Sequence, residues 1–556
     1  MHRRQAACLL TTLSSLRKAV HDVAQRHSCM RWMQNSAVGQ ANVITVPKRI
    51  SEKIDSLRKS RGPIKWRGRV FNARPGKELI SAKRKEFNYY QNQTYDKFKP
   101  PKLASDGWKH KRSCGDHFTI LAFRGNPSLQ DRGDSADKPT TFTSFDLNEK
   151  LLLALGNMDI KSPTKIQSAA IPSILKGRNV LCAAETGSGK TLAYLLPVLH
   201  MLLWETATHG RATQAGRPRC LVLVPGWELA QQIKFVAASL LKETSLVARY
   251  LDGSKSPKSL RHTFLTPADV VISTPGPVLN CLRQKFMTLE SATHIVVDEC
   301  DTMLDDSFCN TLLNILQRMH ISTRSQSQTK PFEETQLILA GATMPKQAAE
   351  TLKDILPEKA LEIVATTHLH RIMPHVSQKF LRLHSQDKAA KILEIVTKDS
   401  RQSIPVMMFC NEVSTCNWLA LFLEESNISV LRLNGDMDPE KRKGVMRSFQ
   451  KGVSNVLVST DIGSRGMDTI QVRHVVNFDF PRFMSDYIHR VGRVGRVGGS
   501  SGDHVTSFVV HKWDVDLVRK IERAVRVRDA LPKVNANIKN KLVQRLVEQD
   551  DSGIFL

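Results

Sequence analysis

The sequence predicts an α/β fold of two tandem domains, each built around a parallel sheet, with a basic N-terminal arm before them. From about residue 140 onward, short apolar runs that end in a glycine, a proline or an acid alternate with stretches of helical period. This alternation is typical of parallel sheets wound with helices. A break over residues 358–374 divides the apolar runs into two sets, and the 556-residue chain is long enough for two or three domains with proper cores.

The positive charge is concentrated near the N-terminus. The formal net charge is +28, and residues 1–112 alone contain 26 Lys and Arg against 7 Asp and Glu. Such an asymmetry indicates a polyanionic partner, a targeting signal, or both.

The cysteine pattern and the apolar runs exclude several classes of protein. The ten cysteines form no Cys-x-x-Cys pair and no regular spacing with histidines, so neither a zinc module nor a disulfide framework is indicated. A reducing compartment is the simplest interpretation. The longest nearly continuous apolar run, residues 192–203, is far shorter than the roughly 20 residues of a membrane span, and we expect no transmembrane segment.

Residues 1–33 have the composition of a mitochondrial transit peptide. They contain six Lys and Arg and a single acid, Asp22, and aliphatic residues between Leu9 and Val20 fall on one helical face opposite basic ones. A basic, acid-poor, amphipathic N-terminus predicts a location in the mitochondrial matrix. The alternative is a basic surface helix or a nuclear signal, which corresponds to a nuclear or nucleolar location.

Residues 34–138 show no sustained period, and we expect them to be mostly a flexible, basic arm. Residues 61–112 carry fifteen Lys and Arg against four acids. Because cations neutralise phosphates and aromatic rings stack on unpaired bases, the mixture suits single-stranded or structured RNA. A solvated, poorly ordered basic segment is an equally good interpretation. The interleaved aromatic residues are Trp66, Phe71, Phe87, Tyr89, Tyr90, Tyr95, Phe98 and Trp108.

Two sets of predicted strands define two domains, residues 139–365 and residues 372–515. The first set is expected at residues 179–183, 220–224, 270–273, 294–297 and 336–340. The second set is expected at residues 406–409, 430–433, 455–458, 475–478 and 505–510. An amphipathic helix over residues 512–528 is expected to pack on the second domain and leads into a basic helical tail over residues 516–556. In such sheets, ligands bind at the carboxyl ends of the strands.

A phosphate-binding loop follows the first predicted strand. Gly187 and Gly189 let the backbone turn its N–H groups inward, while Lys190 supplies a charge for the β- and γ-phosphates and Thr191 offers a hydroxyl to Mg²⁺. An ordinary glycine-rich turn is the alternative, but the full motif between a strand and a helix is uncommon by chance. The predicted nucleotide-binding residues are Ala184, Glu185, Thr186, Gly187, Ser188, Gly189, Lys190 and Thr191.

A pair of acids follows the predicted strand at residues 294–297. Asp298 can hold Mg²⁺, together with Thr191 and partly through water, and Glu299 can orient the attacking water. Acids after a strand are also common helix caps. That role suits Asp301, but it is a poor explanation for two consecutive acids beside a phosphate loop.

Together these motifs resemble the DEAD-box RNA helicases, and the resemblance extends from Phe142 to about Val510. The sequence Asp298-Glu-Cys-Asp301 is similar to the motif after which the family is named, and Ser162-Pro-Thr-Lys-Ile-Gln167 is similar to its adenine-reading Q motif. The resemblance implies two RecA-like domains with ATP and Mg²⁺ bound between them. It also implies that Gln167 faces the adenine, that Phe142 is the upstream aromatic residue, and that Asp468 meets the ribose.

The second predicted domain resembles the family at its arginine-rich motif, which ends the segment from Tyr487 to Arg496. There Arg493 and Arg496 correspond to arginine fingers that reach the γ-phosphate. The resemblance therefore implies hydrolysis only when the cleft is closed, which would need both ATP and RNA. The residues implied to couple hydrolysis to domain movement are Asp301, Gly341, Ala342, Thr343, Arg465, His489 and Arg490.

RNA contacts are implied for loops of both domains, mostly to phosphates and 2′-hydroxyls, so that sequence selectivity should be slight. The first domain departs from the family here. Gly226 and Trp227 replace a threonine and an arginine, and Pro277 replaces an arginine. The loss of two cations predicts weaker RNA binding by this domain, with Trp227 either packed or stacked on a base. The implied RNA-contacting residues are Gly253, Thr274, Gly276, Gly435, Arg442, Thr460 and Gly463.

Two further departures lie beside the acids. Cys300 replaces an alanine, which is a small apolar change. Gly341 lacks a hydroxyl that the family uses to contact the acids, which predicts looser coupling without an effect on ATP binding.

The sequence therefore predicts an ATP-dependent RNA helicase with a monomeric core, which remodels structured RNA or ribonucleoprotein locally. Its N-terminal composition extends the hypothesis to assembling mitochondrial large ribosomal subunits as partners. The alternative is an RNA-binding assembly scaffold with weak or no ATP turnover, suggested by the altered RNA motifs. The residues that argue against this scaffold are Lys190, Asp298, Glu299, Arg493 and Arg496.

Overall fold

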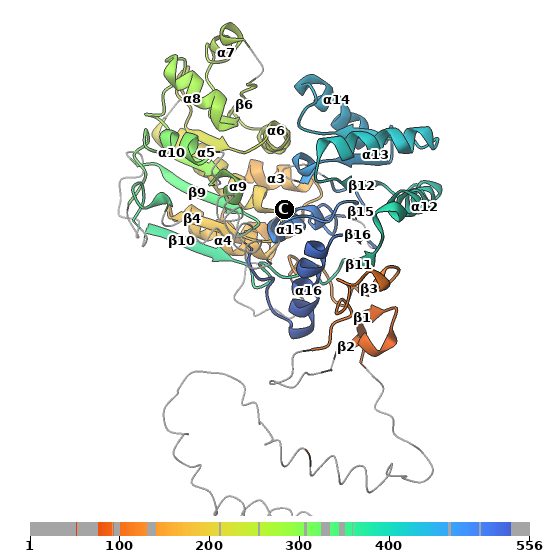
Figure 1. The fold of residues 1–556 in the computed structure, drawn as a ribbon. Coiled ribbons are helices and arrows are strands. Elements are labelled where there is room, and N and C mark those ends of the chain that lie inside the picture. Colours follow the sequence, from red (N-terminus) through yellow and green to blue (C-terminus); the bar gives the residue numbers. More distant parts are fainter. Residues whose placement is uncertain are drawn as a thin grey trace, which may run out of the picture. The chain divides into compact units, whose positions relative to one another are not determined.

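Two parallel sheets form two α/β domains in the computed structural model of the chain (Figure 1). Contacts divide the chain into residues 1–74 and residues 75–556, and the elements below all lie in the second unit. The predicted fold class is confirmed. The structure describes Glu52 and residues 76–91, 93, 101–130, 141–210, 213–253, 256–304, 308–323, 334–343, 351–357, 360–464, 469–499 and 502–534.

The first domain contains a seven-stranded, fully parallel sheet in the order β10-β4-β9-β8-β5-β7-β6. The five predicted strands are present within one residue of their expected bounds. The short strand β6 and strand β10, at the two edges, are additions to that prediction. The strands are β4 (Asn179–Ala183), β5 (Cys220–Leu223), β6 (Ala248–Tyr250), β7 (Val270–Ser273), β8 (His294–Val297), β9 (Gln336–Gly341) and β10 (Leu361–Ala365).

Helices cover both faces of this sheet, because its strands are apolar on both sides. In β4, Val180 and Cys182 belong to one hydrophobic core, whereas Leu181 belongs to the other. The helices are α3 (Glu149–Asn157), α4 (Lys165–Leu175), α5 (Lys190–His209), α6 (Trp227–Leu241), α7 (Pro257–Thr263), α8 (Pro275–Arg283), α9 (Cys300–Met303) and α10 (Cys309–Leu316).

The second domain contains a nine-stranded sheet in the order β13-β14-β12-β15-β16-β11-β3-β1-β2. Its first six strands are parallel, and β11 is an addition to the five predicted ones. The strands of this part are β11 (Ser377–Arg382), β12 (Val406–Phe409), β13 (Leu431–Leu433), β14 (Val456–Ser459), β15 (His474–Asn477) and β16 (His504–Val509). The helices are α12 (Lys388–Arg401), α13 (Val413–Glu425), α14 (Pro439–Gln450), α15 (Met484–Val491) and α16 (Lys512–Val527).

Three strands from the N-terminal side complete the second sheet. They are β1 (Glu78–Ala82), β2 (Tyr89–Tyr90) and β3 (His117–Ile120), and β3 pairs antiparallel with β11. In Figure 1 these orange strands lie beside β11 and the blue helix α16. The expectation of a flexible arm over residues 34–138 is therefore wrong for the described residues between 76 and 130.

The physical reason is that isolated apolar residues of this segment share one core with distant parts of the chain. Ile80, Trp108 and Phe118 pack in the same cluster as Val515 and Ile521 of α16. Helix α16 packs in the core of the second domain, as predicted. Residues 516–527, which the sequence assigns to a C-terminal tail, are therefore part of this domain. The expected transit peptide and the end of the tail, residues 535–556, lie outside the described residues.

Short 3-10 turns complete the described elements. They are η1 (Lys85–Phe87), η2 (Lys111–Ser113), η3 (Phe142–Phe145), η5 (Ser385–Asp387) and η6 (Asp461–Ser464). None of the helices in the described part of the chain combines the length and the apolar character that a bilayer span requires.

Candidate active site

The phosphate loop lies between the carboxyl end of β4 and the start of α5. Gly187 (φ 75°) and Gly189 (φ 88°) adopt the left-handed conformation that favours glycine. The Lys190 ammonium donates hydrogen bonds to the carbonyls of Ala184 and Glu185, both at 2.8 Å. The lysine is thus held directly beside the loop, as the motif predicts.

The acid pair follows β8 directly. Asp298 is buried; its Oδ2 accepts a hydrogen bond from the Tyr194 hydroxyl and its Oδ1 accepts one from the Glu299 amide, both at 2.8 Å. Burial, with the neighbouring Glu299 carboxylate, raises the pKa of Asp298 to about 6. Glu299 has a φ of 48°, which is uncommon for a residue other than glycine. Such strained positions concentrate at functional sites.

A buried contact joins the first domain to the second at Asp301. Its Oδ2 accepts hydrogen bonds from the Thr343 hydroxyl (2.7 Å) and the Thr343 amide (2.9 Å), and lies 3.5 Å from Nε2 of His489 in α15. Burial alone would raise the pKa of Asp301, but the interactions with His489 and Thr343 hold it below its ordinary range. The predicted coupling residues Asp301, Thr343 and His489 are therefore in contact. Ala342, which directly precedes Thr343, is also buried.

The segment after α15 packs directly on the phosphate loop. The Val497 amide donates to the Gly187 carbonyl at 3.2 Å, and the Arg496 side chain lies so close that a Cβ on Gly187 would come within 2.6 Å of it. Gly492 touches Thr186 so tightly that a side chain at position 492 would collide with the threonine hydroxyl. The two domains therefore meet at this loop.

The other two arginines of the predicted motif, Arg490 in α15 and Arg493 after it, have different surroundings. The guanidinium of Arg490 is fully buried and donates to both carboxylate oxygens of Asp461, at 2.6 and 3.0 Å, and to the Asn411 side chain at 2.7 Å. It thereby fixes the loop that follows β14. Arg493 is also buried, and its Nε donates to the His489 carbonyl at 3.1 Å.

Gln167 connects the start of α4 to the phosphate loop. Its Oε1 accepts from the Thr164 amide at 2.9 Å in a capping box, and its Nε2 donates to the Gly189 carbonyl at 3.0 Å. A Cβ on Gly189 would approach this Nε2 to 2.5 Å. The amide keeps one hydrogen and one lone pair for a base edge. Phe142 lies in the core of the first domain, edge-on to Phe145.

The comparisons with known proteins agree with this geometry. The description "DEAD/DEAH box helicase" matches residues 164–352, and "Helicase conserved C-terminal domain" matches residues 387–498. A mouse protein named "Probable ATP-dependent RNA helicase DDX28" is 40% identical over 514 residues, which cover 90% of this chain and 94% of that protein. The chain belongs to the DEAD-box family of ATP-dependent RNA helicases.

Two further relatives support this membership. The human protein of the same name is 40% identical over 513 residues, with 90% of this chain and 93% of that protein covered. The structure described as "S. cerevisiae Dbp5 bound to RNA and ADP BeF3" is similar with a TM-score of 0.57 and 26% identity, covering 69% of this chain and 93% of that one. The predicted family is confirmed.

The phosphate loop of this DEAD-box protein fits a triphosphate. Besides the backbone turn and Lys190, it offers the buried hydroxyls of Thr186 and Ser188, neither of which has a hydrogen-bond partner among the described residues. Buried polar atoms of this kind usually have partners. The donor set is therefore of the type that phosphate oxygens would satisfy.

Residues 123–130, here named the strap, cross from the second domain to the first beside this loop. The amides of Phe123 and Arg124 donate to the Pro374 carbonyl of residues 366–376, here named the linker, which connect β10 of the first domain to β11 of the second. Further along, the side chain of Asn126 donates to the Gly495 carbonyl at 3.1 Å, and the Ser128 carbonyl accepts from the Lys165 amide of α4 at 2.9 Å. The strap thus bonds to the Q motif and to the arginine-bearing segment at once.

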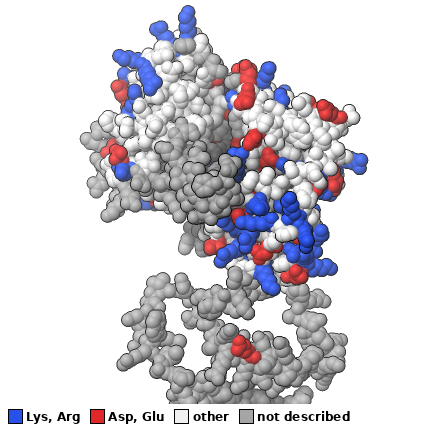
Figure 2. All heavy atoms as spheres, in the orientation of Figure 1, with Lys and Arg blue, Asp and Glu red and all other residues white. Residues whose placement is uncertain are grey.

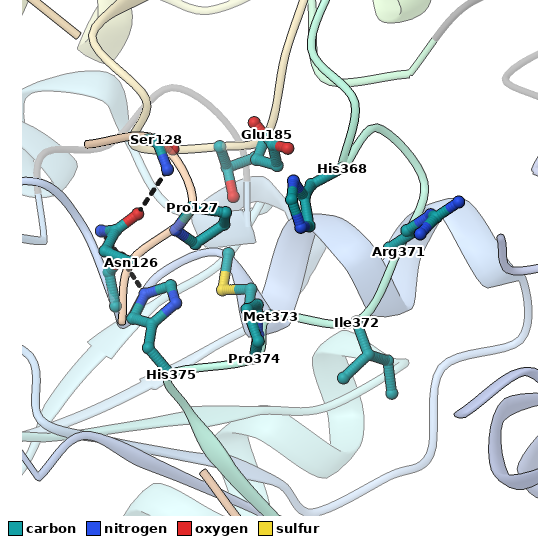
Figure 3. Close-up of a pocket in the computed structure, with 12 residues that line it drawn as sticks. Asn126, Pro127, Ser128, Glu185, His368, Arg371, Ile372, Met373, Pro374 and His375 are labelled. Atoms are coloured by element: carbon teal, nitrogen blue, oxygen red, sulfur yellow. Dashed lines mark hydrogen bonds between the residues drawn. The ribbon is translucent and has the colours of Figure 1, made fainter. Parts of the chain in front are cut away.

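A cavity of about 10 Å³, roughly the space for one water, separates the strap from the phosphate loop and the linker. In Figure 3, Asn126 and Ser128 line one side of it, near Glu185, and His368 and Met373 of the linker line another. The contact between the domains is therefore tight here.

The sequence gives little signal for the role of the strap. It lies in the segment read as a flexible arm, and its Asn126-Pro-Ser128 sequence indicates only a turn. His375 and Asp503 were equally missed: the His375 ring contacts the Gly495 carbonyl at 2.7 Å, and Asp503 accepts from the Gly495 amide at 2.8 Å. The side chains of Asn126, His375 and Asp503 thus all contact Gly495, which lies between the two predicted arginine fingers in the sequence.

The predicted RNA-contacting residues follow strands at the carboxyl edges of the two sheets. Gly253 follows β6, whereas Thr274 and Gly276 begin α8 after β7. Pro277 packs on Gly253, where a Cβ would come within 2.7 Å of the proline ring. The departure at Pro277 is therefore in contact with one of the implied RNA-contacting residues, Gly253.

In the second domain, Gly435 follows β13, and Thr460 and Gly463 follow β14. Arg442 of α14 faces Glu228 of α6 across the domains, and its charge opposes the rise that burial causes in the pKa of Glu228. The residues that follow strands are thus placed as predicted along the two sheets, while Arg442 faces a carboxylate. Arg465 and Asp468 lie outside the described residues.

Proposed function

We propose that this DEAD-box helicase hydrolyses ATP only while RNA holds its two domains together, and that it uses this cycle to unwind or remodel structured RNA locally. The observation that carries the proposal is the direct contact between the phosphate loop and residues 492–497. Groups of both domains meet at one loop, so any separation of the domains would remove groups from the reacting centre. An arginine finger contributes on the order of 10³ to 10⁵ in rate.

Each group of the active site would have a separate role in ATP hydrolysis. The loop amides and Lys190 would bind the β- and γ-phosphates, and Asp298 with Thr191 would hold Mg²⁺, which neutralises charge that develops on the transferred phosphoryl group. Tyr194 and the Glu299 amide already orient the two oxygens of Asp298. Glu299 would orient the attacking water. Arg493 and Arg496 would stabilise the transition state from the second domain.

RNA-stimulated ATPase activity of the full chain tests this proposal. We expect RNA to raise the wild-type rate, and Glu299→Gln to lower the stimulated rate by about 10² to 10⁴ with ATP binding retained. Glu290→Gln is the matched control, because Glu290 is an exposed carboxylate paired with Arg217. Equal, negligible rates for wild type and Glu299→Gln would instead favour an RNA-binding assembly scaffold, which the missing cations at Trp227 and Pro277 also favour.

We further propose the mitochondrial matrix as the location and assembling large ribosomal subunits as the RNA-containing partner. The support is the basic, acid-poor composition of residues 1–33. A fluorescent protein fused behind residues 1–33 is expected to enter mitochondria, and the full chain is expected to sediment with large-subunit precursors. Nuclear or nucleolar fluorescence, or sedimentation apart from all ribosomal precursors, would contradict the proposal.

A further inference from the structure

We propose that the second domain carries a second RNA-binding surface, which binds the phosphates of structured RNA outside the cleft and without ATP. The surface, here named the basic platform, consists of the described residues 83–91, 93 and 101–112 and the exposed face of α16. The inference rests on the proposed function for its choice of RNA as the polyanion. It adds a site that the motifs of the family do not contain.

The basic platform is a rigid part of the fold, because a buried carboxylate ties its two halves together. Both oxygens of Glu522 in α16 accept hydrogen bonds from residues 104–105: from the Ala104 amide at 2.7 Å, the Ser105 amide at 3.0 Å and the Ser105 hydroxyl at 2.7 Å. Arg526 also bonds to Glu522 and donates to the Phe87 carbonyl. The cations of both halves are therefore held at fixed relative positions.

Positive charge gathers on this surface. Figure 2 shows Lys and Arg side chains concentrated at the lower right, where Figure 1 places α16, β1 and β2, whereas much of the remaining described face is uncharged. On α16 the exposed face repeats at helical spacing. Its charged residues are Lys512, Asp516, Arg519, Lys520 and Arg523.

Most acids of the platform are already neutralised. Asp116 pairs with Lys83 and Arg84, Asp106 pairs with Arg519, and Asp516 pairs with Lys109. Within the described platform, Glu86 remains as an exposed acid without an ion pair, and the exposed Asp529 lies just beyond the end of α16. The platform cations that have no ion pair among the described residues are Lys85, Lys102, Lys111, Arg112, Lys512, Lys520 and Arg523. The surface therefore has an excess of positive charge.

The chemistry of the platform suits phosphates rather than bases. Two of the aromatic residues that the sequence offers for base stacking, Trp108 and Tyr89, are unavailable because they are buried in the core. Lysine and arginine side chains on a rigid surface bind the backbone of an RNA helix by charge and shape, with little sequence preference. A duplex or hairpin RNA is therefore the expected partner.

The position of the platform separates it from the cleft. Thr460 and Gly463 follow β14, and five steps across the sheet lead from β14 to β3. At about 4.8 Å per step this is about 24 Å. An RNA that occupies only the cleft would not reach the platform, whereas a longer structured RNA would contact both sites.

The experiment compares two triple variants of the full chain, which remove equal charge. The first neutralises exposed cations of the platform, with Lys111→Gln, Arg112→Gln and Arg523→Gln. The second is the control and neutralises exposed cations of the first domain, with Lys150→Gln, Lys176→Gln and Lys242→Gln. Binding of a hairpin RNA without ATP is measured over a range of salt concentrations, and ATPase activity is measured with a short single strand at saturation.

We expect the platform variant to bind the hairpin at least tenfold more weakly, with a slope of log K against log salt that is smaller by about 2. Its ATPase rate with the short strand should equal that of wild type, and the control should leave both measurements unchanged. Equal hairpin affinity and slope in all three proteins would overturn the inference, as would equal weakening by both variants, which is the result of general charge alone.

The test separates this inference from the proposed function. If wild type shows no RNA-stimulated ATPase activity but the platform variant alone loses hairpin affinity, the proposed function fails and the surface stands. If RNA-stimulated ATPase activity is present and the platform variant binds the hairpin as tightly as wild type does, the platform is not an RNA-binding site and the proposed function is supported. Vesicles with anionic headgroups that bind wild type as tightly as the hairpin does, and with the same loss in the platform variant, would assign the platform to a membrane and overturn the choice of RNA.

Discussion

Two residues that depart from the family pattern occupy one space beside the catalytic acids. A Cβ on Gly341 would lie 2.9 Å from the Cys300 sulfur and 3.0 Å from the Thr343 carbonyl. The larger residue at position 300 therefore fits because the residue at position 341 has no side chain. Taken alone, the missing hydroxyl at Gly341 predicts looser coupling between ATP hydrolysis and domain movement. Thr343, however, still donates two hydrogen bonds to Asp301, one from its amide and one from its hydroxyl.

We predict that Gly341→Ser destabilises the first domain, because its side chain would press on the Cys300 sulfur in a closely packed core. Overpacking of this kind costs about 1–3 kcal/mol. Denaturant unfolding of the single variant measures the loss.

The double variant Cys300→Ala and Gly341→Ser is the control, and it should recover most of the stability. Additive effects of the two substitutions would show that the residues do not share this space.

At the scale of residues, sequence predicts roles that depend on local structure. The phosphate loop is only a few residues long and is held between β4 and α5, so its backbone geometry follows from the local sequence motif. The role of Trp108 depends instead on partners far along the chain, since its ring packs against Phe118, which stacks on Phe380 of β11. Nothing near Trp108 in the sequence shows that it is buried rather than available to a base.

At the scale of elements, the strap joins the parts of the site that must move relative to each other. It reaches the linker through Pro374, the Q motif through Lys165 and the arginine-bearing segment through Gly495. A second bond to α4 runs from the Gln130 side chain to the Ser168 hydroxyl at 2.7 Å.

We predict that Asn126→Ala lowers the RNA-stimulated ATPase rate constant about fivefold, with little change in the melting temperature. The substitution removes one hydrogen bond to the residue between Arg493 and Arg496, and such a bond contributes about 1 kcal/mol. Steady-state kinetics with saturating ATP and RNA measure the effect.

Asn126→Asp separates the two roles of this side chain. It keeps the oxygen that accepts from the Ser128 amide but loses the donor to Gly495. It should therefore resemble Asn126→Ala in rate. A wild-type rate in Asn126→Asp would mean that the turn, and not the bond to Gly495, matters.

The elements that sequence predicts are those with continuous apolar runs. Central strands such as β5 and β12 are buried on both faces and stand out as short blocks of aliphatic residues. Strand β3, with the sequence His-Phe-Thr-Ile, alternates polar and apolar residues, and β11, with the sequence Ser-Gln-Lys-Phe-Leu-Arg, contains only two apolar residues. So few apolar residues do not distinguish a strand from a loop. The position of β3 in the sheet depends on its pairing with β11, which follows the first domain in the sequence.

At the scale of the whole molecule, the first domain is an insertion within the second. Strands β1 to β3 precede the first domain in sequence, and their partner β11 follows it. Cutting the chain at the linker therefore does not separate two complete domains.

We predict that residues 372–534 alone form an unstable, aggregating domain, because β11 then has an unpaired edge and Phe380 loses its stacking partner Phe118. Residues 76–130 joined to residues 372–534 by a flexible linker should give a soluble, cooperatively melting domain. Size-exclusion chromatography and thermal melting compare the two. A monomeric, equally stable short fragment would contradict the prediction.

The insertion also sets an order of events during synthesis. Ile120 and Ser377, which lie side by side at the start of β11, are 257 residues apart, and at roughly 5–20 residues per second the ribosome needs on the order of 10–50 s to make the chain between them. All strands of the first sheet are made within that interval, so the first domain can fold while β3, which can already pair with β1 on one side, still lacks its second partner, β11. The other neighbour of β11 is β16, which emerges later still. The nascent chain therefore presents one unpaired edge of β3 for nearly half of its synthesis, and the second domain is completed last.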